Sequence, residues 1–239
     1  MAVSVDIKAL LEAGVHFGHK TSRWHPKMAP YIHSKRQDIH IIDLVKTVEG
    51  LEAALPFVKS VVASGKKILF VGTKRQAQGT VRKIAEEIGQ PFVVERWLGG
   101  MLTNVATVSQ QIKNLRSLES RMDSGDLAKR YNKLEVQRFQ EEIDDLNKKY
   151  GGIKDLSGKP GAVFVTDILE DKNAVLEAKK LGVPVIAIVD TNGDPSTVDY
   201  PIAANDDAIK SIEIIAGYIA QAVREGETSQ KNADVKKAE

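Results

Sequence analysis

The chain has 239 residues, of which 42% are hydrophobic, enough for one large domain or a domain that carries an insertion. It contains no cysteine, which excludes disulfides and thiol catalysis and fits a reducing cytosol. The net charge is only +2, so charge distribution matters more than the sum. No apolar run approaches the roughly 18 residues of a membrane span, and a signal-peptide pattern is lacking, so we expect a soluble cytoplasmic protein.

A basic segment without acidic residues lies near the N-terminus. After a short amphipathic helix closed by Gly14, residues 15–36 read VHFGHKTSRWHPKMAPYIHSKR and contain four of the five histidines. Its glycine and prolines predict irregular structure. Basic residues interleaved with aromatic residues are typical of RNA binding, because the cations contact phosphates while the rings stack on unpaired bases.

The histidines of this segment raise the alternative of a metal site. His16, His19 and His25 could serve as ligands, but the segment supplies no carboxylate or thiolate. Gly18 and Pro26 also interrupt any single helix that could carry several ligands. Histidines that pack in the protein or face RNA are the other interpretation, and we predict no metal.

A β-α-β unit is predicted from residue 66 to residue 104, after a strand at 39–42 and a helix that reaches residue 63. We expect a kink or break in that helix at Pro56. The unit contains strands at Ile68–Val71 and Phe92–Val94, with a helix between them.

Its first half is strongly basic. Between residues 66 and 85 there are six Lys or Arg and no acidic residue, an arrangement that suits phosphate. Both common glycine patterns of nucleotide-binding loops are absent, so we predict no cofactor and no small-molecule substrate. A solvated helix start without a ligand is the alternative.

Residues 105–150 show a different periodicity. Apolar residues recur at spacings of three and four on both sides of a turn at residues 123–126. This pattern predicts a helical hairpin with a narrow apolar seam, close to a coiled coil. Its mixed charged faces are either solvated or form an arm toward RNA or a partner.

The α/β pattern resumes after Gly151. It predicts strands at 162–166 and 184–189, a last short strand near Ile202 and a final helix over 206–223. The fold class is therefore α/β: a parallel sheet flanked by helices in flavodoxin- or Rossmann-like layering, with an inserted coiled-coil hairpin. We expect a core formed by residues 1–104 and 151–225, a projecting hairpin at 105–150 and a disordered tail at 226–239.

The loop after residue 189 raises a second hypothesis of a metal site. Its sequence DTNGDPS begins like a calcium loop. However, Pro195 and Pro201 stand where such a loop needs a glycine and a bidentate glutamate, and a tight turn is the favoured interpretation.

Five segments in register together resemble the bacterial small-ribosomal-subunit protein two family (the S-two family), and the likeness runs from residue 3 to residue 226. They are residues 13–19 (AGVHFGH), 24–28 (WHPKM), 69–75 (LFVGTKR), 96–104 (RWLGGMLTN) and 187–195 (AIVDTNGDP). The resemblance implies a non-catalytic ribosomal protein that binds small-subunit ribosomal RNA near the junction of head and body. Neighbouring ribosomal proteins, including the messenger-binding S-one protein that it helps to dock, are the implied partners.

Position by position, the resemblance also implies a set of RNA-binding residues. Gly99 and Gly100 would allow RNA to approach the backbone closely, because neither has a β-carbon. The set consists of His19, Lys20, Arg23, Trp24, Lys27, Thr73, Lys74, Arg75, Arg96, Gly99, Gly100 and Asn104.

Two other classes compete with this interpretation. An enzyme on a doubly wound scaffold could bind a nucleotide or sugar phosphate at the strand ends, since fold alone does not exclude it. The missing glycine patterns and the lack of a clearly spaced nucleophile and base argue against an enzyme. A protein adaptor that acts through the hairpin is the third class, and loss of partner docking without loss of RNA binding on hairpin deletion would indicate it.

Overall fold

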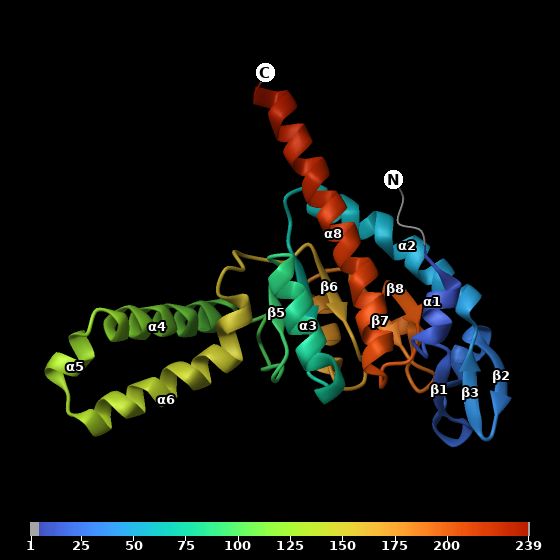
Figure 1. Ribbon diagram of the computed structural model, residues 1–239, viewed down its shortest axis with the longest axis horizontal. Coiled ribbons are helices and arrows are strands. Elements are labelled where there is room, and N and C mark those ends of the chain that lie inside the picture. Colours follow the sequence, from blue (N-terminus) through green and yellow to red (C-terminus); the bar gives the residue numbers. More distant parts are fainter. Residues whose placement is uncertain (1–4, 239) are drawn as a thin grey trace.

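The computed structural model describes residues 5–238 and has a five-stranded parallel sheet at its centre (Figure 1). The strand order is β5-β4-β6-β7-β8, and every neighbouring pair is parallel. The predicted α/β class is confirmed. The strands are β4 (Ile68–Val71), β5 (Phe92–Val93), β6 (Ala162–Val165), β7 (Val185–Val189) and β8 (Tyr200–Ala203).

Alternate residues of these strands enter two separate cores, because successive side chains point to opposite faces of a sheet. Phe70 and Phe164 meet edge to face, with ring centroids 5.4 Å apart, in the core beneath α2, α3 and α8. Leu69 and Val163 point the other way, toward α7 and the loop around Trp97. The helices are α1 (Ile7–Glu12), α2 (Leu44–Ala63), α3 (Arg75–Glu87), α7 (Lys172–Lys180) and α8 (Ile209–Ala238).

Residues 15–36, expected to be irregular, form much of a second, antiparallel sheet of order β1-β3-β2. The expectation of irregular structure is wrong because Gln37 and Asp38 both adopt positive φ, +48° and +60°, which closes a tight hairpin between β2 and β3 without glycine. The segment contains two strands, β1 (Phe17–Lys20) and β2 (Ile32–Arg36), and two 3₁₀ helices between them, η1 (Thr21–Arg23) and η2 (Pro26–Tyr31). Strand β3 (Ile39–Ile42) completes the sheet.

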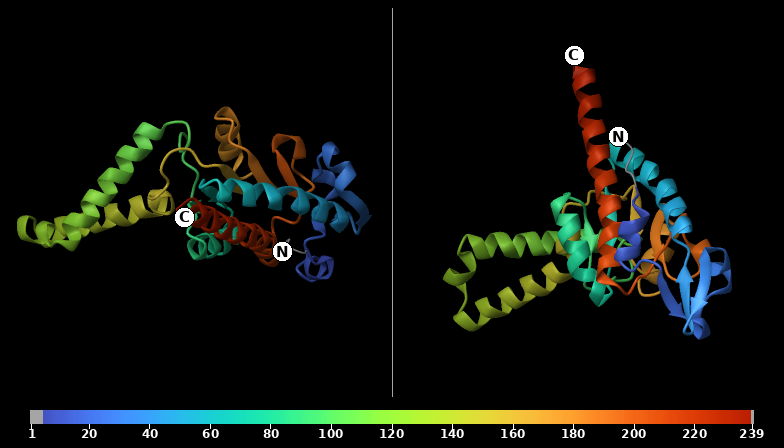
Figure 2. Two further views of the ribbon diagram at one scale, coloured as in Figure 1. Left: turned by 90° about the horizontal axis from the view of Figure 1, so that it is seen from above. Right: turned by 45° about the vertical axis from the view of Figure 1, so that its right-hand side comes forward.

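Two long helices leave the sheet at the end opposite to this small antiparallel sheet (Figures 1 and 2). Helix α4 (Val105–Asp123) leads through α5 (Asp126–Arg130) to α6 (Lys133–Tyr150). They pack through a small apolar cluster in which Leu115 and Leu118 meet Ile143 and Leu146. The coiled-coil character of the pair stays a prediction.

The two helices rejoin the body at η3 (Gly151–Ile153). A β-carbon at Gly152 would lie 2.2 Å from the carbonyl oxygen of Phe92, so glycine is needed for η3 to pack directly on β5.

Two expectations about helices differ from the structure. Pro56 does not break α2, which is continuous, and its position on the exposed side lets water satisfy the carbonyl that loses its donor. The tail after residue 226 is helical to Ala238 where disorder is predicted, whereas residue 239 lies outside the described part. Gly226 lies against the Lys59 carbonyl, and Glu225 pairs with Lys59 Nζ at 3.0 Å, so packing on α2 carries α8 onward.

Within residues 5–238, no helix is both long enough and apolar enough to span a membrane.

Candidate nucleic-acid interface

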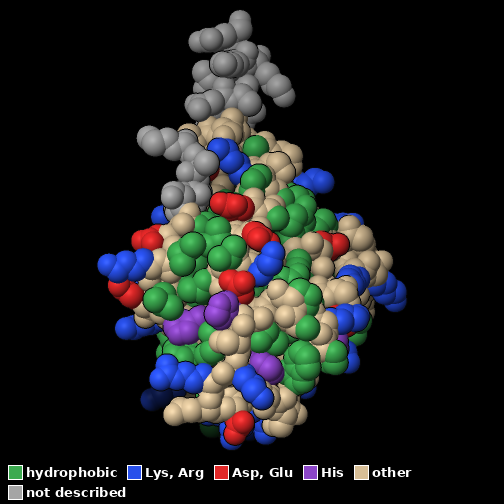
Figure 3. Space-filling model, turned by 90° about the vertical axis from the view of Figure 1, so that its right-hand side faces the viewer, with side chains coloured by type: hydrophobic (Ala, Val, Ile, Leu, Met, Phe, Trp, Pro, Cys, Tyr) green, Lys and Arg blue, Asp and Glu red, His purple; other side chains and the backbone are tan. Residues whose placement is uncertain are grey.

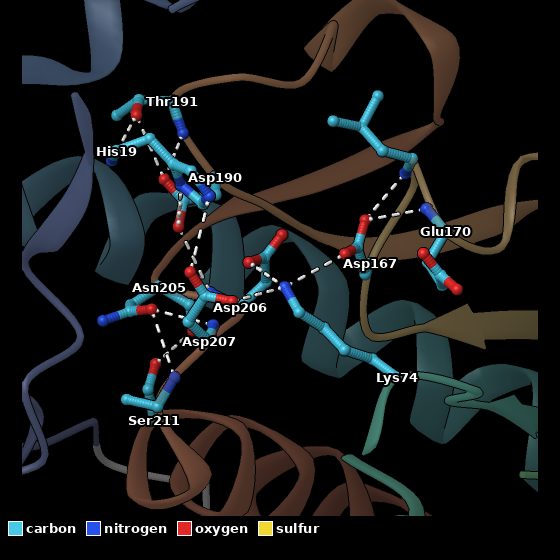
Figure 4. Close-up of polar contacts among 12 residues, drawn as sticks. His19, Lys74, Asp167, Glu170, Asp190, Thr191, Asn205, Asp206, Asp207 and Ser211 are labelled. Carbon is cyan, nitrogen blue, oxygen red and sulfur yellow. Dashed lines mark hydrogen bonds and ion pairs between the residues drawn. The ribbon is translucent and has the colours of Figure 1, made fainter. Parts of the chain in front are cut away.

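The predicted site residues come from two parts of the chain. One group follows strands β4 and β5 of the parallel sheet: Thr73, Lys74, Arg75, Arg96, Gly99, Gly100 and Asn104. The other group lies on β1 and the segment after it: His19, Lys20, Arg23, Trp24 and Lys27. Because parallel strands all end at the same edge, the loops after β4, β6, β7 and β8 meet there (Figure 4). Thr73 and Lys74 follow β4, Asp167 follows β6, and Asp190 follows β7. We call this edge the carboxyl rim of the sheet.

Lys74 lies at the centre of an acidic cluster on this rim. Its Nζ is 3.1 Å from Asp167 Oδ2, 2.7 Å from Asp206 Oδ1 and 2.8 Å from Asp207 Oδ1. Burial by itself would lower the pKa of Lys74, but hydrogen bonds to Asp206 and Asp207 raise it above its ordinary value. The ammonium is therefore already paired within the protein.

Asp206 shows the cost of gathering carboxylates in one place. Burial and repulsion from Asp167 and Asp190 raise the pKa of Asp206 to about 7, against the opposing effect of Lys74. Asn205 holds this segment in place, because its side-chain Oδ1 accepts from the backbone N–H groups of Asp207 and Ala208 just before α8.

His19 connects the antiparallel sheet to the rim. Its backbone N–H donates to Thr191 Oγ1 at 2.8 Å, and its ring nitrogens lie 3.1 Å from Asp190 Oδ2 and 3.4 Å from Asp207 Oδ2. The hydrogen bond with Asp190 raises the pKa of His19. A β-carbon at Gly18 would lie 2.6 Å from Thr191 Cγ2, so glycine permits this close contact.

Among the described residues, the group that could hold a metal ion joins His19 to Asp206 and Asp207, not to His16 and His25. Its ligand atoms lie within 4.8 Å of one another. The Lys74 ammonium contacts the same two carboxylates and supplies their positive counter-charge.

Two further acidic residues hold predicted site residues in place. Asp171 accepts hydrogen bonds from the Thr73 backbone N–H at 3.2 Å and from Thr73 Oγ1 at 2.9 Å. Burial raises the pKa of Asp171 to about 6, although these two hydrogen bonds oppose the rise. Glu177 on α7 receives hydrogen bonds from the loop between Arg96 and Asn104.

The other predicted side chains differ in whether they already have a partner within the protein. Lys27 is paired, with its Nζ 2.8 Å from Asp194 Oδ2, and Asn104 caps α4 by accepting from the Thr107 N–H. Trp24 is 39% exposed and packs at a tilt against His40. Among the predicted residues, the exposed cations without an ionic partner in the described part of the chain are Lys20, Arg23, Arg75 and Arg96.

The sequence interpretation missed the acidic residues that contact Lys74 and His19. Asp167 and Asp190 each follow a predicted strand directly, so the rule that parallel strands end together could have placed them beside Lys74. Asp206 and Asp207 carry no such signal, because they follow a short strand and precede a helix start. The rim therefore holds Lys74 paired with acidic residues, while its neighbour Arg75 is exposed.

The fold and the rim define an α/β protein that presents exposed cations at the carboxyl edge of its sheet. A model of the family described as Ribosomal protein S2 matches residues 10–226. Small ribosomal subunit protein uS2 of Roseiflexus sp. (strain RS-1) is 49% identical over 97% of this chain and 88% of its own length. The uS2 proteins of Coprothermobacter proteolyticus and Chloroflexus aurantiacus are 50% and 51% identical, over 95% and 93% of this chain and 84% and 93% of their own lengths.

The chain therefore belongs to the ribosomal protein S2 family. This family membership makes it a structural component of the small ribosomal subunit, which is cytoplasmic in bacteria, and not an enzyme. A place in that subunit implies ribosomal RNA and ribosomal proteins as its neighbours.

Proposed function

We propose that the chain binds small-subunit ribosomal RNA near the junction of head and body through the free cations of its carboxyl rim. The observation that carries this proposal is the separation of two kinds of cation. Lys74 and Lys27 are committed to internal carboxylates, whereas Arg75 and Arg96 are exposed and unpaired among the described residues. Arginine presents a planar fork that matches a phosphate, so these two residues are suited to the RNA backbone.

The mechanism is electrostatic and depends on a rigid platform. The buried acids fix the loops without neutralising the outer cations, and each phosphate contact adds a salt-dependent increment to affinity. Lys20 and Arg23, with the half-exposed Trp24, extend the surface onto the antiparallel sheet, where a ring can stack on an unpaired base.

Arg75→Ala should weaken binding to small-subunit RNA about fivefold at moderate salt. The slope of log affinity against log salt concentration should fall by the amount that about one phosphate contact contributes. The exposed side chain has no ionic partner among the described residues, so the fold should be unchanged. We would measure RNA affinity by filter binding at several salt concentrations. Sedimentation of the tagged chain through a sucrose gradient, at low magnesium to split the ribosome, would show its incorporation into subunits.

Arg130→Ala on α5 is the matched control, since that arginine pairs locally with Asp126. Equal affinity of wild type and Arg75→Ala would contradict the role of Arg75. A folded chain that stays at the top of the gradient would contradict the ribosomal proposal itself.

We further propose that the face over α1 and the antiparallel sheet is where a protein partner docks, with the S-one protein as the partner that the resemblance suggests. Large apolar side chains are exposed here: Ile7 (48%), Leu11 (51%), Phe17 (48%) and Val45 (56%). Figure 3 shows hydrophobic side chains gathered on this side of the molecule. An exposed apolar patch of this kind marks an interaction surface.

Leu11→Glu should lower the amount of S-one protein that cosediments with small subunits about fivefold, because a charge is placed in an apolar contact. Leu134→Glu is the matched control, since Leu134 is 61% exposed on α6, within the paired helices. Loss of the S-one protein with Leu134→Glu alone would refute docking at α1 and favour an adaptor role for α4–α6.

A further inference from the structure

The carboxylate of Glu177 lies at the centre of the loop between Arg96 and Asn104. Its Oε1 accepts from Trp97 Nε1 at 3.1 Å and from the Gly100 N–H at 2.7 Å. Its Oε2 accepts from the Leu102 N–H at 3.0 Å and from Thr103 at two atoms, the backbone N–H and Oγ1, both at 3.1 Å. One side chain from α7 thus satisfies five donors of a loop more than 70 positions away in sequence.

A carboxylate is the only ordinary side chain that can do this. It has two oxygens that only accept, with about four lone-pair sites. An amide would turn an NH₂ group toward at least two of the donors and would leave them unsatisfied. Burial by itself would raise the pKa of Glu177, but the hydrogen bonds from Gly100 and Trp97 lower it, so the group is charged at neutral pH.

The loop has little other backbone support. Within it, the Met101 N–H donates to Leu98 O and the Asn104 N–H donates to Gly100 O. Gly100 adopts a φ of +92°, a conformation that turns the neighbouring N–H groups toward one point. Trp97 and Met101 are buried beneath the loop, whereas Arg96 and Gly99 face solvent.

The N–H groups that converge here form an anion-binding concavity of the kind that often holds a phosphate. In this protein the concavity is already filled by Glu177. RNA therefore has to bind the outer surface of the loop. A β-carbon at Gly99 would meet no atom within 4 Å, so that outer surface is open.

We propose that Glu177 is the positioning residue of the Arg96–Asn104 loop: it acts as an internal anion that holds the loop in one conformation and so presents Arg96 and Gly99 to RNA. This inference rests on the proposed RNA-binding function. Glu177 itself makes no contact with RNA in this arrangement, and its effect passes through the backbone of the loop.

The test compares Glu177→Gln with Glu170→Gln, an exposed glutamate just before α7 whose side chain has no hydrogen-bond partner among the described residues. Hydrogen exchange at Gly100, Leu102 and Thr103 should speed up about tenfold or more in Glu177→Gln and stay unchanged in Glu170→Gln. RNA affinity should fall about fivefold in Glu177→Gln, close to the loss caused by Arg96→Ala.

The pH dependence of amide protection separates the positioning role of Glu177 from a merely structural role. In the wild type, protection of the three amides should be present at neutral pH and lost as pH falls through the lowered pKa of Glu177. In Glu177→Gln the loss should be absent, because no group titrates at that position. If Glu177→Gln does not fold, Thr103→Val removes one donor, keeps the carboxylate and should give a smaller increase in exchange.

The outcomes distinguish the inference from the proposed function. Unchanged exchange at the three amides in Glu177→Gln would overturn the inference. Faster exchange with normal RNA affinity, while Arg96→Ala weakens binding, would also overturn it, because the conformation of the loop would then not matter. If neither Arg96→Ala nor Arg75→Ala weakens RNA binding, the proposed rim interface fails, and the exchange data still decide whether Glu177 holds the loop.

Discussion

Replacing Lys74 by alanine should lower the free energy of unfolding by about 3 kcal/mol at neutral pH. The change removes the ammonium that contacts Asp167, Asp206 and Asp207, and the Asp206 side chain is only 3% exposed. Carboxylates left together without their cation repel each other and remain poorly hydrated. Urea denaturation followed by circular dichroism would measure the loss.

The matched control is the next residue along the chain. Arg75 is exposed and lacks an ionic partner among the described residues, so Arg75→Ala should change stability by less than about 0.5 kcal/mol. Lys74 lowers the pKa of Asp206, so this pKa should be higher in Lys74→Ala than the wild-type value of about 7. The deficit should therefore shrink as pH falls through that higher pKa, because protonation of Asp206 relieves the repulsion. Equal stabilities of the two variants would show that the acidic cluster does not depend on Lys74.

This expectation changes how Lys74 should be tested as an RNA-binding residue. A double replacement of Lys74 and Arg75 would combine a loss of folding stability with a loss of phosphate contact. The single Arg75→Ala variant isolates the contact. Lys74→Arg keeps a positive charge beside the carboxylates and would show whether charge alone restores the cluster.

Asp171→Asn should stabilise the protein by roughly 3 kcal/mol at pH 8. The folded-state pKa of Asp171, about 6, lies above the ordinary value of 3.8. Below both pKa values Asp171 is neutral in the folded and the unfolded state and does not affect the free energy of unfolding. As pH rises from about 4 to about 6, the folded state loses stability, because it must hold a buried carboxylate. Asparagine removes that charge, and both hydrogen bonds with Thr73 can persist because the hydroxyl of Thr73 can accept as well as donate.

The measurement is unfolding free energy at pH 4, 6 and 8 for the wild type, Asp171→Asn and Asp123→Asn. Asp123 is exposed at the end of α4 and serves as a matched replacement without burial. The difference between Asp171→Asn and the wild type should grow from pH 4 to pH 8, whereas Asp123→Asn should follow the wild type. A constant difference across this range would mean that Asp171 does not titrate as described.

Local structure with a strong period was predictable from sequence. The strand at Ile68–Val71, the helix ending at Ala63 and the strand at Ile39–Ile42 agree with the structure, because burial on one or both faces of an element imposes a regular spacing of apolar residues. The β2–β3 hairpin was missed because Gln37 and Asp38 are not the usual glycine-containing pair at positive φ.

The sequence by itself therefore determined the α/β class, the order of its main elements and, through five segments in register, the family resemblance. Only the tertiary structure decided which cations are free. Lys74 looks like Arg75 in sequence, yet it meets acids that lie 93, 132 and 133 positions further on, at Asp167, Asp206 and Asp207. Ion pairs between residues so far apart in sequence produce no periodic pattern in the local sequence, because they depend on which strand ends share one edge of the sheet. For the same reason, only the folded chain brings Glu177 to the loop that it organises.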